Sequence, residues 1–122
     1  MISVEQCYAL CGGNYEDVKN RLRSDALIQR FTVKFLADTS YETLCTALKD
    51  NQYEEAFRAA HTIKGVAMNL AFSRLAASSE QLTELLRGCE EKEVDQEQCQ
   101  KWFDQVTCDY QEVVSAVKQL VD

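Results

Sequence analysis

The chain has 122 residues, 46% of them hydrophobic, and a formal net charge of −7. This length suits one domain over residues 1–122, which can bury about two-thirds of its unfolded surface. Because the charge is acidic and forms no basic stripe, we do not expect the chain to bind nucleic acid. No apolar run is long enough for a membrane span and the N-terminus lacks the features of a signal peptide, so we expect a cytoplasmic protein that binds no membrane.

Helix caps predict two short helices at the start of the chain. Ser3–Gln6 has the pattern of a capping box and predicts a helix that runs to about Leu10. Gly12–Gly13 ends this helix, because paired glycines interrupt helical segments. Asn14 is a favoured cap residue and predicts a second short helix through about Leu22.

Apolar residues at helical spacing predict the next three helices. The first begins at the cap residue Ser24 and is broken at 38–40, and the second ends near Asp50. The third begins within 51–54 and runs to about Ala71.

Two further helices complete the chain. Ser73 is expected to cap a helix that reaches Gly88, and residues 95–98 are expected to begin the last one. The last helix carries apolar residues at intervals of three and four, namely Phe103, Val106, Tyr110, Val113, Val117 and Leu120. Because strand-like alternation is absent, the chain is predicted to be all-α, an antiparallel four-helix bundle with one or two short additional N-terminal helices that cover one end.

The six cysteines do not predict a disulfide framework or a metal site. They show no CxxC spacing, and the sequence offers only one histidine as a further zinc ligand. We expect reduced thiols that pack as small hydrophobic groups.

The only histidine, His61, lies in the fifth predicted helix. At about 100° per residue, Ala59, Ile63, Val66 and Leu70 all fall within about 40° of the direction opposite to it. These four residues predict a buried stripe. His61 should therefore point to solvent, where an imidazole is available for chemistry.

The neighbours of His61 predict a docking surface around it. Phe57, Met68 and Phe72 fall on the same side of the helix, and an exposed apolar patch is typical of an interaction site. Arg58 adds positive charge beside this surface, which suits a partner with an acidic active site.

Lys64 and Gly65 follow His61 by one helical turn. Glycine inside a helix costs roughly 1 kcal/mol relative to alanine, which indicates a packing or functional reason for Gly65. The missing side chain would let another protein approach the imidazole. Lys64 supplies a positive charge that suits a phosphorylated histidine.

The segment from His61 to Leu70 resembles the signature of histidine-containing phosphotransfer (HPt) domains, which are four-helix bundles. The matching positions are His61, Ile63, Lys64, Gly65, Ala67, Asn69 and Leu70. Val66 departs from the small residue that is commoner in the family, and Ala71 departs from its usual glycine. A left-handed alanine would cost about 1–2 kcal/mol, so we expect the turn at Ala71 to be made differently. The resemblance extends more weakly over most of the chain.

The resemblance implies a phosphorelay carrier in a two-component system. His61 would accept and donate a phosphoryl group as phosphohistidine, in exchange with an aspartate of a response-regulator receiver domain, and a hybrid histidine kinase is a further expected partner. Lys64 would neutralise phosphoryl charge. No cofactor is expected here, because clustered carboxylates are missing and the receiver would hold the magnesium ion. The protein would be a co-substrate rather than an enzyme, and we expect a monomer because nothing demands a dimer.

Thr83 is predicted to lie at the height of His61. A link of two or three residues near Phe72 makes the two helices antiparallel neighbours, and the two residues are each eleven positions from Phe72. In related HPt domains a polar residue at this place orients the imidazole. A hydrogen bond from His61 to Thr83 is therefore predicted, with Glu80 and Glu84 as competing orienters.

The alternative is a helical interaction module that binds a receiver or a kinase without phosphotransfer. The joint presence of His61, Lys64 and Gly65 argues against it. A hydrolase or metalloenzyme is disfavoured, because the sequence offers no base or ligand set around His61.

Overall fold

The computed structural model describes residues 1–121, and these form seven α-helices and no β-strand. The helices are α1 (Val4–Leu10), α2 (Tyr15–Leu22), α3 (Asp25–Phe35), α4 (Ser40–Lys49), α5 (Tyr53–Asn69), α6 (Ser73–Leu86) and α7 (Gln96–Lys118). The all-α prediction is therefore confirmed.

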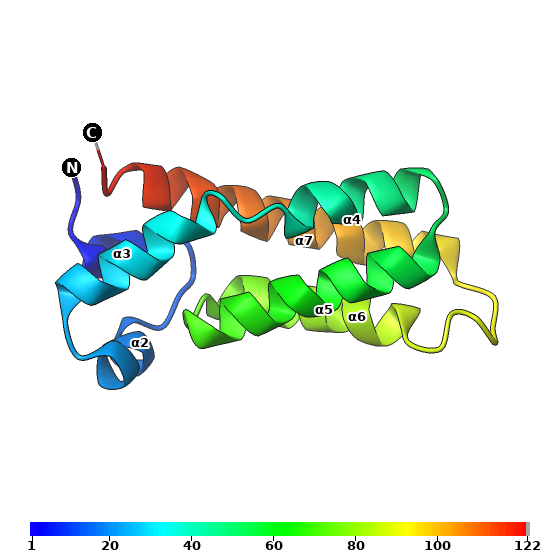
Figure 1. Ribbon diagram of the computed structural model, residues 1–122, viewed down its shortest axis with the longest axis horizontal. Helices are drawn as coiled ribbons and strands as arrows, with labels where there is room; N and C mark the ends of the chain where they lie inside the picture. Colours follow the sequence, from blue (N-terminus) through cyan, green and yellow to red (C-terminus); the bar gives the residue numbers. More distant parts are fainter. Residues whose placement is uncertain (122) are drawn as a thin grey trace.

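A four-helix bundle makes up the main body of the molecule (Figure 1). α3 and α4 follow one another along one side, and α5, α6 and α7 supply the other three sides. α5 packs between α4 and α6, and α6 also packs against α7. The predicted bundle is confirmed, and α1 and α2 are its two short additional helices.

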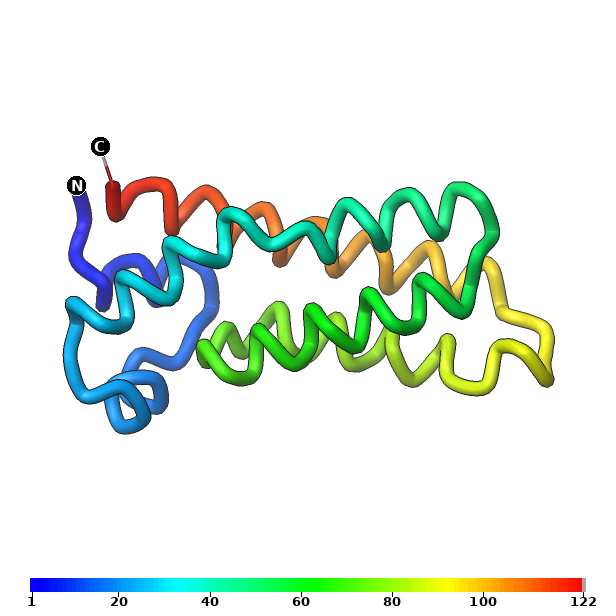
Figure 2. The backbone as a smooth tube through the Cα atoms, in the orientation of Figure 1, coloured from blue at the N-terminus to red at the C-terminus, as the bar shows by residue number. Residues whose placement is uncertain are grey.

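Both ends of the chain lie at the end of the bundle that carries α1 and α2, and the α6–α7 loop lies at the opposite end (Figure 2). The backbone N–H of Ile2 donates to the carbonyl of Gln119 at 3.1 Å. This bond fixes the start of the chain to the end of α7.

The predicted cap residues at the start of the chain act as caps. Ser3 forms a capping box with Gln6, and the side chains of Asn14 and Ser24 each accept a bond from a backbone N–H three residues later. Asp95 does the same for α7. Each bond satisfies a donor that the first turn of a helix leaves unpaired, which explains why these helices begin where the sequence predicts.

The α5–α6 turn is a Schellman motif around Ala71. The N–H of Phe72 bonds to the carbonyl of Ala67 at 2.8 Å, and the N–H of Ala71 bonds to the carbonyl of Met68 at 3.1 Å. Ala71 has a φ of 56°, so the expectation that the turn is made differently is wrong. The left-handed alanine costs about 1–2 kcal/mol, and burial of its methyl group offsets part of this by about 0.8 kcal/mol.

Ser73 is the first residue of α6 and not its cap, which corrects the prediction. Phe72 occupies the cap position and makes no side-chain cap bond. The chain enters α6 directly from the tight turn, and the Ser73 hydroxyl donates to the carbonyl of Ala71 at 3.5 Å instead.

A chain of aromatic rings runs through the core. Phe72 is fully buried and contacts the rings of Tyr8 and Phe35, with centroids 5.3 Å and 5.5 Å away. Phe35 reaches Tyr110 at 5.8 Å, and Tyr110 stacks on Tyr41 at 4.2 Å. These contacts tie the α5–α6 turn to α1, α3, α4 and α7.

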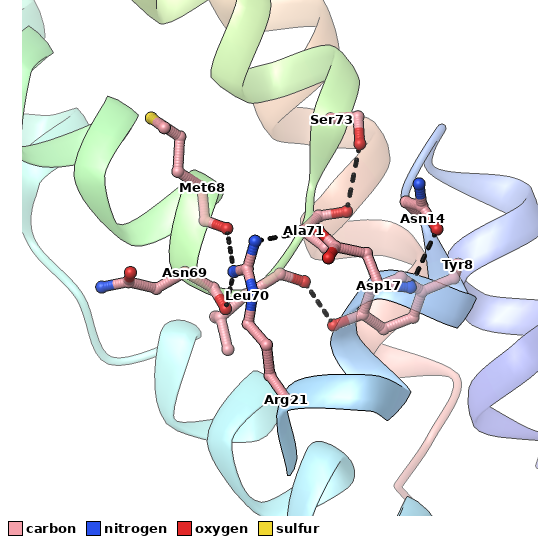
Figure 3. A network of polar contacts seen from close by, with 9 residues as sticks. All are labelled: Tyr8, Asn14, Asp17, Arg21, Met68, Asn69, Leu70, Ala71 and Ser73. Carbon is pink, nitrogen blue, oxygen red and sulfur yellow. Dashed lines mark hydrogen bonds and ion pairs between the residues drawn. The ribbon is translucent and has the colours of Figure 1, made fainter. Parts of the chain in front are cut away.

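Residues of α1 and α2 cap the carboxyl end of α5 (Figure 3). The buried Tyr8 hydroxyl donates to the carbonyl of Leu70 at 2.7 Å. The Arg21 guanidinium donates to the carbonyls of Met68 and Asn69 at 2.6 Å and 2.9 Å. The last carbonyls of a helix lack partners in that helix and carry partial negative charge, so a cation is well placed there.

Two neighbouring contacts complete this cap. The backbone N–H of Asn14 donates to the carbonyl of Ala71 at 2.8 Å. Asp17 accepts from Arg21 at 2.8 Å and orients its guanidinium toward α5. The N-terminal helices therefore hold the turn that follows the histidine helix.

The described cysteines are free thiols. Cys7 and Cys11 are buried at the end of α1, and a hydrogen bond to Cys11 together with burial raises the pKa of the Cys7 thiol. Burial raises the pKa of Cys99. Both thiols stay protonated and pack as small hydrophobic groups, as expected.

We predict that Tyr8→Phe lowers the free energy of unfolding by about 1–3 kcal/mol, because it leaves the buried Leu70 carbonyl without its donor. Urea denaturation followed by circular dichroism measures the loss. Tyr53→Phe is the matched control, because the exposed Tyr53 hydroxyl only contacts Asn51 at 3.3 Å, and it should cost less than about 0.5 kcal/mol. Equal losses in the two variants would contradict the capping role of Tyr8.

Candidate functional site

α5 presents His61 to solvent. Ala59, Ile63 and Leu70 on the opposite side of the helix are buried, and Val66 is half-buried. The predicted orientation of the helix is therefore correct. Among the described residues, His61 makes no side-chain hydrogen bond, so both ring nitrogens are available to a reactant.

An aromatic ring and a guanidinium lie on one side of the imidazole. Phe57 is half-buried and stacks near His61, with centroids 6.1 Å apart and an interplanar angle of 26°. The guanidinium of Arg87, the residue that follows α6, lies over the Phe57 ring, 5.2 Å from its centroid. Phe57 thereby restricts the imidazole on the side of the site toward the start of α5.

The ammonium group of Lys64 lies across the α5–α6 interface from Glu80. The Nζ atom is 3.7 Å from the Glu80 carboxylate, and the Lys64 side chain is 20% exposed against 54% for Glu80. The aliphatic stem of Lys64 is thus largely covered, while its charged end reaches the surface that carries His61.

Glu84 of α6 is a second carboxylate close to His61. Arg87 donates two hydrogen bonds to it, each of 3.0 Å. These bonds lower the pKa of the Glu84 carboxyl, and the positive charges of Arg87 and Lys64 add to the effect. Glu84 is therefore ionised next to the imidazole.

Gly65 has open space around its α-carbon. A β-carbon placed there would meet none of the described atoms within 4 Å beyond its own helix. Packing inside the protein therefore does not require glycine at this position. Of the packing and functional reasons considered for Gly65, only the functional one is left.

The register of α5 and α6 agrees with the predicted hairpin. Lys64 and Glu80 are each eight positions from Phe72, and Phe57 and Arg87 are each fifteen positions from it; both pairs are in contact. Residues equidistant from Phe72 thus lie at the same height, as the sequence argument assumed.

Thr83 has the predicted height but faces the interior. It is fully buried, and its hydroxyl donates to the carbonyl of Ser79 at 2.6 Å. Among residues 1–121 it has no hydrogen bond to His61, so the structure lacks the predicted bond. The height argument fixes position along the helix but not the direction of the side chain, and Glu84, the next residue, is the one whose side chain is exposed.

The predicted docking surface is partly present. Met68 is 52% exposed, and Arg58 is exposed and pairs with Glu54 at 3.1 Å. Phe72 was expected on this surface, and this is wrong because its side chain is fully buried. α5 ends before Phe72, so the helical angle that placed it beside His61 no longer applies, and the Schellman turn directs its ring into the core.

Sequence reasoning missed Arg87. It directly follows α6 and lies fifteen positions after Phe72, so the same hairpin register would have placed it opposite Phe57. The site therefore combines one nucleophilic imidazole with two cations and two carboxylates.

Within residues 1–121, no group of three or more His, Cys, Asp or Glu side chains is arranged to hold a metal ion. None of the described helices has the length and apolar character needed to cross a membrane.

The comparisons with known proteins identify the family of the chain. No curated protein and no solved structure matches the chain significantly. The family model of the Hpt domain matches residues 36–122, which include His61 and all of α4 to α7. The chain therefore belongs to the Hpt domain family, whose members are phosphotransfer carriers of phosphorelays.

Proposed function

We propose that this protein carries a phosphoryl group on His61 between signalling proteins of a two-component system. The exposed imidazole without an intramolecular hydrogen bond carries this proposal. The expected partners are a response-regulator receiver domain and a hybrid histidine kinase. The family match supports the reaction class, and the outward position of His61 supports its role as the acceptor.

The transfer is a nucleophilic displacement at phosphorus. One ring nitrogen of neutral His61 attacks the phosphorus of the receiver's aspartyl phosphate, a nitrogen–phosphorus bond forms, and the oxygen–phosphorus bond breaks. The aspartate leaves as a carboxylate with the electron pair, and the second ring nitrogen keeps its proton. The reverse reaction donates the group, and the receiver's acidic pocket supplies the magnesium ion.

Lys64 and Gly65 assist this step in different ways. The Lys64 ammonium lies one helical turn from His61 and can neutralise the phosphoryl oxygens. Gly65 leaves open space beside the imidazole, which allows the receiver to approach. Phe57, Arg58 and Met68 contribute contact area around them.

We predict that His61→Gln abolishes phosphorylation while helix content and thermal stability stay nearly unchanged, because an exposed residue contributes little to packing. The protein is mixed with an isolated receiver that carries labelled acyl phosphate, and acid-labile, base-stable label is measured on each variant. Such label on folded His61→Gln would refute the assignment. Receiver binding by the wild type without any label would favour a module that only binds.

We predict that Lys64→Ala slows phosphotransfer about tenfold, which corresponds to about 1.4 kcal/mol in the barrier. The loss should be larger at low salt, since screening weakens exposed charges. Rapid-quench kinetics with a labelled receiver measures the rate. Lys49→Ala removes an exposed lysine on α4 and should leave the rate unchanged. Equal rates for Lys64→Ala and the wild type at both salt concentrations would exclude the role of Lys64.

We predict that Gly65→Ala raises the free energy of unfolding by up to about 1 kcal/mol, because the site has space for a methyl group and alanine favours helix. Gly65→Gln should keep the fold but slow transfer from the receiver, because its longer side chain fills the approach to His61. The alanine variant serves as the control for the glutamine variant. Normal transfer by Gly65→Gln would show that receiver approach does not need this space.

A further inference from the structure

We propose that Glu80 is a positioning residue that holds Lys64 away from the phosphoryl group and so shifts the phosphotransfer equilibrium toward donation to the receiver. This inference rests on the proposed function and extends it to the balance between the two phosphorylated proteins. The family match and the motif around His61 do not assign this role to Glu80.

The geometry places Glu80 in competition with a phosphoryl group for the same cation. Lys64 and His61 are three residues apart on one face of α5, and the Lys64 ammonium lies 3.7 Å from the Glu80 carboxylate. A phosphoryl group on His61 would bring two negative charges to that face. Lys64 can neutralise it fully only by weakening its contact with Glu80.

The negative charge of Glu84, the other carboxylate of the site, is balanced mainly by Arg87, its ion-pair partner. Glu84 receives two bonds from Arg87, both of 3.0 Å, and Arg87 also covers Phe57. Within residues 1–121, Glu80 has no ion-pair partner besides Lys64. Glu80 is therefore the carboxylate that forms an ion pair with Lys64, the cation one helical turn from the imidazole.

The consequence for the equilibrium follows from the charges. Before transfer, Lys64 and Glu80 stabilise one another, and this contact favours unphosphorylated His61. After transfer, Glu80 retains part of the Lys64 charge, so Lys64 neutralises the phosphoryl oxygens less completely. Both effects raise the free energy of phosphohistidine relative to the receiver's aspartyl phosphate.

The expected size of the effect is modest, because the pair is partly exposed. Ion pairs of this kind contribute at most about 1 kcal/mol, which is about fivefold in an equilibrium constant. We therefore expect Glu80→Gln to raise the ratio of phosphorylated carrier to phosphorylated receiver about twofold to fivefold.

The test measures the transfer equilibrium between the 122-residue chain and an isolated receiver with slow dephosphorylation. Labelled receiver and carrier are mixed at several ratios, and the plateau amounts of the four species give the equilibrium constant. This constant does not depend on how tightly the proteins dock, so a purely structural or docking effect of Glu80→Gln leaves it unchanged. The measurement is repeated at low and high salt, where screening should reduce the change.

Two further variants separate the causes. Glu112→Gln removes an exposed glutamate that pairs with Arg74 at 2.6 Å, away from His61, and should leave the equilibrium constant unchanged. In a Lys64→Met background, Glu80→Gln should have a much smaller effect, because the cation for which Glu80 competes is gone.

The outcomes distinguish this inference from the proposed function. A raised constant for Glu80→Gln that depends on Lys64 supports it. An unchanged constant, or an equal change with and without Lys64, overturns it while the carrier function stands. Absence of label on wild-type His61 overturns both.

Discussion

The Schellman turn at Ala71 fixes the register of α5 against α6, and the contacts of the site that join these two helices depend on that register. The turn places Phe72 in the core and starts α6 at once, so residues equidistant from Phe72 lie at the same level along the two helices. Lys64 then lies against Glu80, and Phe57 against Arg87. An inserted or deleted residue in this turn would rotate α6 by about 100° and separate these pairs.

The site lies on a surface that contributes little to the stability of the bundle. The aromatic chain from Tyr8 through Phe72 to Tyr41 begins in the interior and ends at half-buried rings packed against the core, whereas the ion pairs around His61 are exposed or half-exposed. Exposed ion pairs stabilise a fold by only about 0–1 kcal/mol. Because the fold does not require the particular charges around His61, these residues can be suited to the electrostatics of a reaction or to contact with a partner.

Much of the fold could be predicted because its signals are local. Caps such as Asn14 and Ser24 act within one turn of chain, and the apolar stripe of α5 gave the outward direction of His61 correctly. The errors arose where a local rule was extended too far. Helical angles placed Phe72 on the surface although α5 ends before it, and the height of Thr83 said nothing about its direction.

Other features could not be predicted because they depend on tertiary contacts. The bond from Arg21 to Met68 joins residues 47 positions apart, and the bond from Tyr8 to Leu70 joins residues 62 positions apart. No spacing within one helix encodes such contacts. The left-handed Ala71 belongs to the same class, because Asn14 bonds its carbonyl and the core buries its methyl group.

Residues of α1 and α2 cap the carboxyl end of α5, so a fragment without these two helices loses that cap. The family match starts at residue 36, in the segment between α3 and α4, whereas Tyr8, Asn14 and Arg21 all precede it. A fragment cut at that boundary would keep His61, Lys64 and Gly65 but expose the carbonyls from Met68 to Ala71, together with one face of Phe72. The histidine helix would then fray from its carboxyl end, one to two turns from Lys64. The shortest fragment expected to keep this turn intact is therefore longer than the stretch that matches the family model.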